Sequence, residues 1–224
     1  MYIDIHTHGQ QPPAGKQVRI VNLPFPPPSP EPPDYYSTGI HPWDAQAGCD
    51  SRLRQIEECL SSSPRIIAIG ETGLDALKGP EKNIQQQCFV RHIALSEKYH
   101  KPLIIHCVKA FPELTALRKK HKPRLSWILH GFASRQSIAL QLAEAGFFLS
   151  FGPALLYRPA LQDILQHLPP HRLFFETDAH PSCTIEEIYH TAAEILHLSQ
   201  EQLQQQVEEN FRQAFGITPL ITTL

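Results

Sequence analysis

Several short segments of this chain are apolar at every position rather than at every second position. Residues 65–69 read Arg-Ile-Ile-Ala-Ile, and residues 102–105 read Pro-Leu-Ile-Ile. A strand with one buried face alternates apolar and polar residues, whereas a continuous apolar run is buried on both faces. Such runs are typical of parallel sheets that helices cover. The sequence therefore predicts a fold built around a parallel sheet.

We expect eight strands in this sheet. They cover residues 2–5, 18–23, 36–40, 66–69, 103–105, 125–129, 147–151 and 172–175. Helical patterns separate most of them, and the alternation of strands with helices is typical of parallel α/β folds. Eight strands of this kind suggest a closed barrel. The prediction is an α/β fold, a distorted (β/α)₈ TIM barrel, in a single domain over residues 1–224.

Four of the expected helices have clear signals in the sequence. Apolar residues recur along one stripe in residues 51–62 and in residues 81–100. Residues 184–187 and 199–202 have the form of capping boxes, in which a Ser or Thr and a Glu or Gln three positions later bond each other's backbone amides. We therefore expect a helix to begin at each of these two positions.

The connections after the first two strands do not fit a helix. Residues 24–33 contain seven prolines, and each proline in a helix interior costs about 3 kcal/mol. Residues 9–16 are short and are broken by Pro12, Pro13 and Gly15. We predict that the barrel lacks helices after these strands and that the proline run is an extended surface connection. The C-terminal helix, or a second copy in a homo-oligomer, would cover the sheet there.

Polar residues that can bind metals close the predicted strands. His6 and His8 are two positions apart, so on a strand their side chains point the same way. The full set is His6, His8, His41, Glu71, His106, His130 and Asp178. Barrel active sites are built at the carboxyl ends of the strands, and imidazoles with carboxylates suit Zn²⁺, Mn²⁺ or another first-row divalent ion. All of these residues except His41 are predicted metal ligands, and Glu71 could bridge two ions as in phosphoester-cleaving sites.

Composition limits the other classes of function. The chain has 20 Lys and Arg against 22 Asp and Glu, for a net charge of −2, which argues against a general basic face for nucleic acid. Its five cysteines are scattered and form no CxxC motif, as expected for reduced thiols in a cytoplasmic protein. The apolar runs are far shorter than the ~20 residues that cross a bilayer, so no membrane association is predicted.

These motifs together resemble the TatD family of metal-dependent hydrolases, within the amidohydrolase-like barrels. The matching segments are Asp4-Ile-His6-Thr-His8, Gly39-Ile-His41-Pro42, Gly70-Glu71-Thr-Gly73-Leu74-Asp75, Pro102-Leu-Ile-Ile-His106-Cys, His130-Gly-Phe132 and Glu176-Thr177-Asp178. The resemblance implies two divalent ions, which could be Zn, Mn or Mg. His6, His8 and Asp178 would hold one ion and His106 and His130 the other, with Glu71 between them. It also implies a deoxyribonuclease of the 3′-exonuclease type.

The chain departs from the family pattern near the expected substrate. Val108 stands where the family has an arginine, and Lys109 follows it. One residue is inserted in the segment Asp178-Ala-His180-Pro181, and the aromatic pair that often follows the Gly-Leu-Asp motif is Ala76-Leu77. These changes leave the predicted metal ligands intact. The reaction class is therefore expected to carry over better than the substrate.

The expected reaction is hydrolysis by a metal-activated water, with a DNA end or another phosphodiester as the substrate. Asp178 would orient the water and accept its proton, Glu71 would hold the ions, and His41 would act at the phosphate. His41, Lys109 and His180 are the predicted substrate-binding residues, while Asp4 would hold a ligand histidine or a backbone amide.

Two alternatives stay open. One is an amidase, lactonase or esterase that acts on small molecules with the same metals. The other is a non-catalytic binding protein that uses the proline segment.

Overall fold

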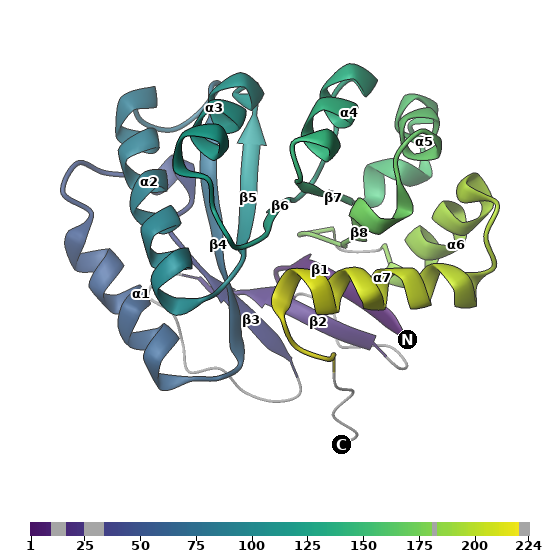
Figure 1. Cartoon of the computed structure of the whole chain (residues 1–224), viewed down its shortest axis with the longest axis horizontal. Coiled ribbons are helices and arrows are strands. Elements are labelled where there is room, and N and C mark those ends of the chain that lie inside the picture. The colour runs from purple at the N-terminus through teal and green to yellow at the C-terminus, as the bar shows by residue number, and fades with distance from the viewer. Residues whose placement is uncertain (10–16, 25–33, 181–182, 220–224) are drawn as a thin grey trace.

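The computed structural model describes residues 1–9, 17–24, 34–180 and 183–219. Its eight parallel strands form one sheet in chain order (Figure 1). The strands are β1 (Tyr2–Thr7), β2 (Gln17–Asn22), β3 (Tyr35–Thr38), β4 (Ile66–Asp75), β5 (Leu103–Val108), β6 (Trp127–Leu129), β7 (Phe148–Phe151) and β8 (Leu173–Phe175). Just after β8, Asp178 pairs with Thr7 of β1 in a parallel bridge. The sheet is therefore a nearly closed barrel, as predicted.

Helices cover the outside of this barrel. They are α1 (Asp50–Ser62), α2 (Lys82–Tyr99), α3 (Phe111–His121), α4 (Gln136–Glu144), α5 (Pro159–Gln166), α6 (Ile185–Leu196) and α7 (Gln200–Phe215). Three 3-10 turns, η1 (Pro42–Asp44), η2 (Pro153–Leu156) and η3 (Pro170–Arg172), lie in the connections. In Figure 1, α1, α2 and α3 lie on one side of the strands and α4 to α7 on the other. Each connection from β3 to β8 thus carries a helix.

Burial follows the apolar runs of the sequence. All ten residues of β4 are buried, and so are all residues of β6, β7 and β8. Both capping boxes form as predicted. The Thr184 hydroxyl accepts from the amide of Glu187 at the start of α6, and the Ser199 hydroxyl accepts from the amide of Gln202 at the start of α7.

The strands extend further than the apolar runs indicated, and this corrects the placement of three predicted ligands. Glu71, His6 and His106 lie within β4, β1 and β5 rather than beyond their ends. The polar end of β4 still pairs with β5 because Gly73, at φ +147°, has no Cβ. A Cβ at Gly73 would lie 2.0 Å from the carbonyl oxygen of His106. Residues 70–75, which contain two glycines and follow the strand predicted over residues 66–69, are therefore part of the strand as well.

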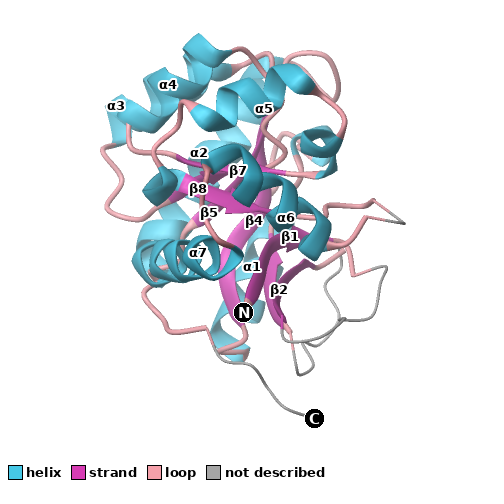
Figure 2. Cartoon of the chain, turned by 90° about the vertical axis from the view of Figure 1, so that its right-hand side faces the viewer, coloured by secondary structure: helices cyan, strands magenta, loops and turns pink. Residues whose placement is uncertain are grey.

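The C-terminal helix lies against the first strands, which was one of the two predicted ways of covering them (Figure 2). The Tyr2 hydroxyl donates to the Gln200 side chain at 2.9 Å. The rings of Tyr35 and Phe211 lie 6.4 Å apart. The homo-oligomer stays a prediction. The predicted absence of helices after β1 and β2, and most of the proline run, fall on residues 10–16 and 25–33, outside the described residues.

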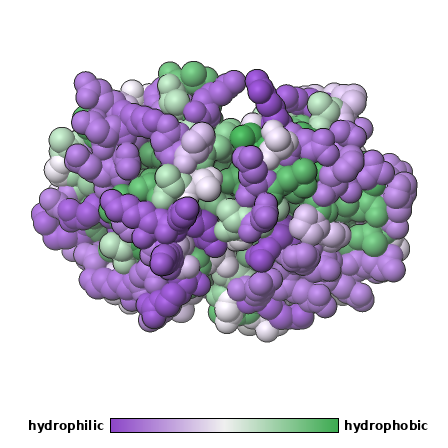
Figure 3. Space-filling model, turned by 45° about the horizontal axis from the view of Figure 1, so that its top comes forward, coloured by the Kyte–Doolittle hydropathy of each residue, from purple (hydrophilic) through white to green (hydrophobic). Residues whose placement is uncertain are grey.

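Hydrophilic side chains predominate on the face of the molecule in Figure 3, with hydrophobic residues between them across its middle. Within the described ranges, no helix combines the length and the apolar character that a bilayer span requires. The five cysteines carry free thiols.

Candidate metal centre

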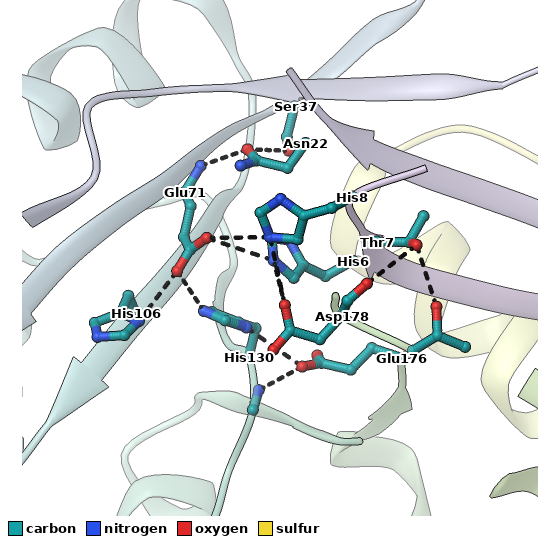
Figure 4. A network of polar contacts seen from close by, with 12 residues as sticks. His6, Thr7, His8, Asn22, Ser37, Glu71, His106, His130, Glu176 and Asp178 are labelled. Atoms are coloured by element: carbon teal, nitrogen blue, oxygen red, sulfur yellow. Dashed lines mark hydrogen bonds and ion pairs between the residues drawn. The ribbon is translucent and has the colours of Figure 1, made fainter. Parts of the chain in front are cut away.

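Imidazoles surround the carboxylate of Glu71 at the carboxyl end of the barrel, and Figure 4 labels four of them. Glu71 Oε1 lies 2.8 Å from His130 Nε2 and 3.0 Å from His106 Nδ1. Glu71 Oε2 lies 3.5 Å from His6 Nε2 and 3.9 Å from His8 Nε2. Glu71 Oε1 therefore faces the histidines of β5 and the β6 end, together with His41 at 3.1 Å. Glu71 Oε2 faces His6 of β1 and His8 just beyond this strand. Glu71 is placed to bridge two groups of ligands.

Asp178 completes the group at β1. Its Oδ1 lies 3.4 Å from His8 Nε2 and 3.7 Å from His6 Nε2. The Asp178 side chain is 44% exposed, whereas the side chain of His6 is fully buried. Asp178 therefore lies between the buried ligands and the open mouth of the barrel.

The buried ring of His6 provides a test of whether these residues fit a metal. Both of its nitrogens are buried and neither has a hydrogen-bond partner among the described residues. Buried polar atoms without partners are rare in folded proteins and call for a water or an ion. Three groups, namely His6-His8-Glu71, His6-His130-Asp178 and His41-Glu71-His106, place their ligand atoms within 4.8 Å of one another. The donor set and the unpartnered ring fit a divalent cation.

Two of the candidate ligand histidines contact a second carboxylate through their other ring nitrogen. His130 directs Nε2 toward Glu71 and Nδ1 toward Glu176 Oε1, at 3.3 Å. His106 directs Nδ1 toward Glu71 and Nε2 toward Asp75 Oδ2, at 3.2 Å. A carboxylate that accepts one ring N–H leaves the lone pair of the other nitrogen available for a metal and fixes the orientation of the ring. Both imidazoles are thus oriented as ligands.

His41 has a different protonation pattern. Its Nδ1 accepts from the backbone amide of Trp43 at 3.2 Å, so in the neutral ring the proton resides on Nε2. This Nε2 lies 3.1 Å from Glu71 Oε1. Although His41 belongs to one of the three candidate groups, its Nε2 is a donor rather than a lone pair. This arrangement favours the predicted role at a substrate oxygen over that of a ligand.

Neighbouring strands hold the ligand-bearing backbone in place. The side-chain oxygen of Asn22, at the end of β2, accepts from the amide of Glu71 at 2.9 Å. On the other side, buried Asp4 accepts from the amide and the hydroxyl of Thr177 and from the amide of His6. Burial raises the pKa of Asp4 to about 7, against the lowering effect of these hydrogen bonds. Asp4 therefore holds the backbone amide of His6, which is one of the two contacts predicted for it.

The electrostatics keep two carboxyls ionised. Burial alone would raise the pKa of Glu71, but the charge of His130 and the hydrogen bonds from His106, His130 and His41 hold it well below its usual range. Burial also acts to raise the pKa of Asp178, yet the hydrogen bond from His8 and the charge of His6 lower it to about 2. Both groups are carboxylates at neutral pH, which is the form that binds cations.

The centre opens into a cleft of about 800 Å³. Its walls include the side chains of His41, Trp43 and Val108. His180 lines a neighbouring cavity of about 380 Å³ that shares Asp178 with the cleft. Lys109 is exposed and lies outside the described linings of both cavities. The structure thus brings His41 and His180 to the mouth, and the substrate roles of all three residues stay predictions.

Sequence reasoning missed three contributors to the site, namely Asn22, Trp43 and Glu176. Glu176 directly follows the apolar strand β8, which is the same signal that identified the candidate ligands. Asn22 ends the partly polar strand β2 and lies inside the strand predicted over residues 18–23, so this signal was absent there. The indole of Trp43 donates to Asp75 Oδ2 at 2.6 Å, and no spacing in the sequence indicates that contact.

A parallel barrel with histidines and carboxylates gathered at the carboxyl ends of its strands defines a barrel metallohydrolase. Comparisons with known proteins agree. A family model described as TatD related DNase matches residues 31–216. YcfH of Escherichia coli, an uncharacterized metal-dependent hydrolase, is 29% identical over 199 residues, which are 81% of this chain and 74% of YcfH. The chain belongs to the TatD family of metal-dependent hydrolases.

Two further relatives bear on the fold and on the reaction. The crystal structure of YJJV, a TatD homolog from Escherichia coli, superposes with a TM-score of 0.81 at 21% identity, covering 96% of this chain and 98% of that one. This similarity shows the fold. The human deoxyribonuclease TATDN3 is 29% identical over 154 residues, which are 63% of this chain and 56% of TATDN3.

Proposed function

We propose that this hydrolase is a phosphodiesterase that removes nucleotides from the end of a DNA strand with the aid of two divalent ions. The observation that carries the proposal is the orientation of Glu71. Its Oε1 faces His106 and His130, with His41 beside them, and its Oε2 faces His6 and His8. Sites with two ions bridged in this way suit in-line displacement at phosphorus, because both the attacking and the leaving oxygen need stabilisation. The distant similarity to the deoxyribonuclease TATDN3 supports the same reaction.

In this proposal His6, His8 and Asp178 would hold one ion, and His106 and His130 would hold the other. When bound, the ions supply positive charge at the phosphoryl oxygens and lower the pKa of water. The residues of the chain orient the reactants. The ionised, partly exposed Asp178 faces the cleft, where it can accept a proton from the attacking water. His41 also lines the cleft, where its Nε2–H can donate to a phosphoryl oxygen beside Glu71.

A second candidate is the hydrolysis of a small amide, lactone or ester. Two observations favour it. The cleft of about 800 Å³ is within the usual range for small-molecule sites, and the net charge is −2. A strand end needs far fewer phosphate contacts than a duplex, so the charge does not oppose an exonuclease.

The test uses purified full-length protein, stripped with a chelator and then supplied with Mn²⁺, Mg²⁺ or Zn²⁺. A labelled single-stranded oligonucleotide is compared with a panel of lactones, amides and carboxylic esters. We expect stepwise release of mononucleotides that requires an added ion. Hydrolysis of panel compounds without cleavage of the oligonucleotide would establish the second candidate instead.

Glu71→Gln keeps the size of the side chain and removes the bridging charge. Loss of a group that merely supports a ligand costs about 10–100-fold, so loss of the bridging carboxylate should lower turnover by more than about 100-fold. Glu58→Gln is the matched control because Glu58 is an exposed residue of α1. Equal turnover by both variants would contradict any metal-dependent hydrolysis at this site.

A further inference from the structure

Exposed hydrophobic side chains gather at the mouth of the barrel. Among the described residues, the large hydrophobic side chains with high exposure are Trp43 at 45%, Leu77 at 69%, Leu140 at 42% and Tyr157 at 66%. Trp43 follows β3, Leu77 follows β4 and Tyr157 follows β7, so these three belong to loops at the carboxyl end of the barrel. Only Leu140 lies elsewhere, on α4. Exposed apolar groups concentrated beside a site indicate contact with a ligand.

The two aromatic residues lie on opposite sides of the metal centre. The eight strands follow one another in chain order, and the bridge between Thr7 and Asp178 joins the last to the first. β3 and β7 are four strands apart and therefore face each other across the ring. Strands about 4.8 Å apart and tilted by about 36° enclose a ring roughly 15 Å across. The loops carrying Trp43 and Tyr157 thus flank the ligand residues from two sides.

Trp43 is held in a fixed orientation on its wall of the cleft. Its Nε1 donates to Asp75 Oδ2 at 2.6 Å, and its ring lies edge-on to His41 with centroids 4.6 Å apart. Lys78 Nζ lies over the indole ring, 4.5 Å from its centroid. Arg52 also lines the cleft on this side. The half-exposed indole therefore offers aromatic surface close to cations that suit a phosphate.

Tyr157 belongs to the neighbouring cavity of about 380 Å³. The walls of this cavity are largely apolar and include Phe132, Pro153, Ala154 and Tyr157. It shares Gly131, Asp178 and Ala179 with the metal cleft. A group that leaves the metal centre on the side of Asp178 would therefore enter an apolar side pocket with an aromatic wall.

We infer that Trp43 and Tyr157 bind the two nucleobases that flank the scissile phosphodiester, one base against the exposed part of the indole and the other in the side pocket. The inference rests on the proposed function and adds the residues that recognise the substrate. Stacking of a base on an aromatic side chain tolerates any sequence, since every base has a π-face. Neighbouring bases in a duplex are only about 3.4 Å apart. Two bases on opposite walls of the ring must be splayed apart, which a single strand permits.

The inference also accounts for the charge of the chain. Binding through two stacked bases and one phosphate releases few counterions, so affinity for the oligonucleotide should depend only weakly on salt. A protein with a net charge of −2 can bind a strand end in this way without a basic groove.

The experiment measures kcat/KM on four single-stranded oligonucleotides. One is intact, one lacks the terminal base, one lacks the base before it, and one lacks both. Each substrate is tested with the wild type, Tyr157→Ala and Trp43→Leu. Because stacking contributes about 1–3 kcal/mol per base, we expect each missing base to lower wild-type kcat/KM by about fivefold or more. In Tyr157→Ala, a missing base at one of the two positions should no longer lower kcat/KM. In Trp43→Leu, a missing base at the other position should no longer lower it. This decrease in kcat/KM for a missing base is the penalty at that position.

Retention of both wild-type penalties by both variants would overturn the inference, and so would loss of the same penalty in both. If the wild type cleaves every substrate equally, the inference fails while the proposed function stands. If it cleaves none of them, the proposed function itself fails. Leu140→Ala is the matched control, since Leu140 is an exposed apolar residue away from both cavities, and it should keep both penalties. Thermal unfolding and metal content are measured for each variant, to separate loss of stacking from loss of the centre.

Discussion

The backbone amide of Asp178 donates to the carbonyl oxygen of His6 at 3.0 Å, and the amide of His8 donates back to the carbonyl oxygen of Asp178 at 3.2 Å. These bonds join the end of β8 to β1, and the same three residues carry candidate ligands. Closure of the barrel and assembly of the metal centre therefore depend on the same contact between the first and last strands. Binding of an ion should stabilise this closure.

We therefore expect removal of bound ions to lower the melting temperature. An ion held at 100 times its dissociation constant stabilises a fold by about 2.7 kcal/mol. A chain of this size shifts by about 2–4 °C per kcal/mol, which gives a decrease of roughly 5–10 °C. Differential scanning calorimetry before and after dialysis against a chelator measures this decrease in melting temperature. The melting temperature should recover when Mn²⁺ or Zn²⁺ is restored, and an unchanged value in protein shown to have lost its metal would contradict the coupling.

Glu176 should determine how tightly His130 holds an ion. Glu176 is fully buried, and its Oε1 accepts from the amide of Gly131 at 2.7 Å and lies 3.3 Å from His130 Nδ1. In Glu176→Gln the amide oxygen can keep both contacts, but the charge that makes the imidazole a better ligand is lost. We expect affinity for one ion to fall by about 10–100-fold, measured by calorimetric titration of metal-free protein. Exposed Glu144 on α4 provides the control Glu144→Gln, and equal affinities in the two variants would argue against the role of Glu176.

His41 should affect turnover without affecting metal content. Its Nε2 carries the proton, because Nδ1 accepts from the amide of Trp43. His41→Asn keeps an acceptor for that amide, but its shorter side chain no longer places a donor at the position of Nε2. Loss of a single donor to a developing oxyanion costs about 100–1,000-fold in turnover in other enzymes, and we expect a decrease of about 100-fold here. His106→Ala, by contrast, should lose an ion. If elemental analysis shows that His41→Asn also loses metal, His41 is a ligand.

The sequence was sufficient for the barrel and for the convergence of the candidate ligands, because both depend on local patterns. Runs such as residues 102–105 indicate strands buried on both faces, and a metal-binding side chain at the end of such a run has few structural explanations. Since the carboxyl ends of parallel strands share one rim, Glu71 and Asp178 could be placed together without knowledge of the register.

Contacts that depend on strand register and on backbone angles could not be predicted from the sequence. Nothing in the spacing pairs Glu176 with His130 or the indole of Trp43 with Asp75, because each pair joins different loops and strands. The position of Lys109 could not be predicted from the sequence either. Lys109 directly follows β5 and has a left-handed backbone, with φ +55°. Its side chain is exposed and lies outside the described linings of both cavities.

Buried His92 of α2 supports the loop that carries His41. Its Nε2 accepts from the amide of Ile40 at 3.0 Å, and its Nδ1 donates to the carbonyl oxygen of Cys88 at 2.8 Å. Both bonds require the neutral ring, because a proton on Nε2 would oppose the Ile40 N–H. Burial accordingly lowers the pKa of His92 from 6.5 to about 4, against the raising effect of the bond to Cys88.

This lowered pKa predicts a loss of stability in acid. Between pH 6.5 and about 4 the unfolded chain binds a proton that the folded chain does not, so the free energy of unfolding falls as the pH falls, by about 3 kcal/mol in total. Above pH 6.5 the group contributes no pH dependence. Urea denaturation of chelator-treated protein at pH 7.5, 6.5, 5.5 and 4.5 compares the wild type with His92→Gln, which cannot titrate. The stability advantage of the wild type should shrink over this range, whereas His171→Gln, at an exposed position, should follow the wild type. A constant difference between the wild type and His92→Gln would show that His92 is not held neutral by the fold.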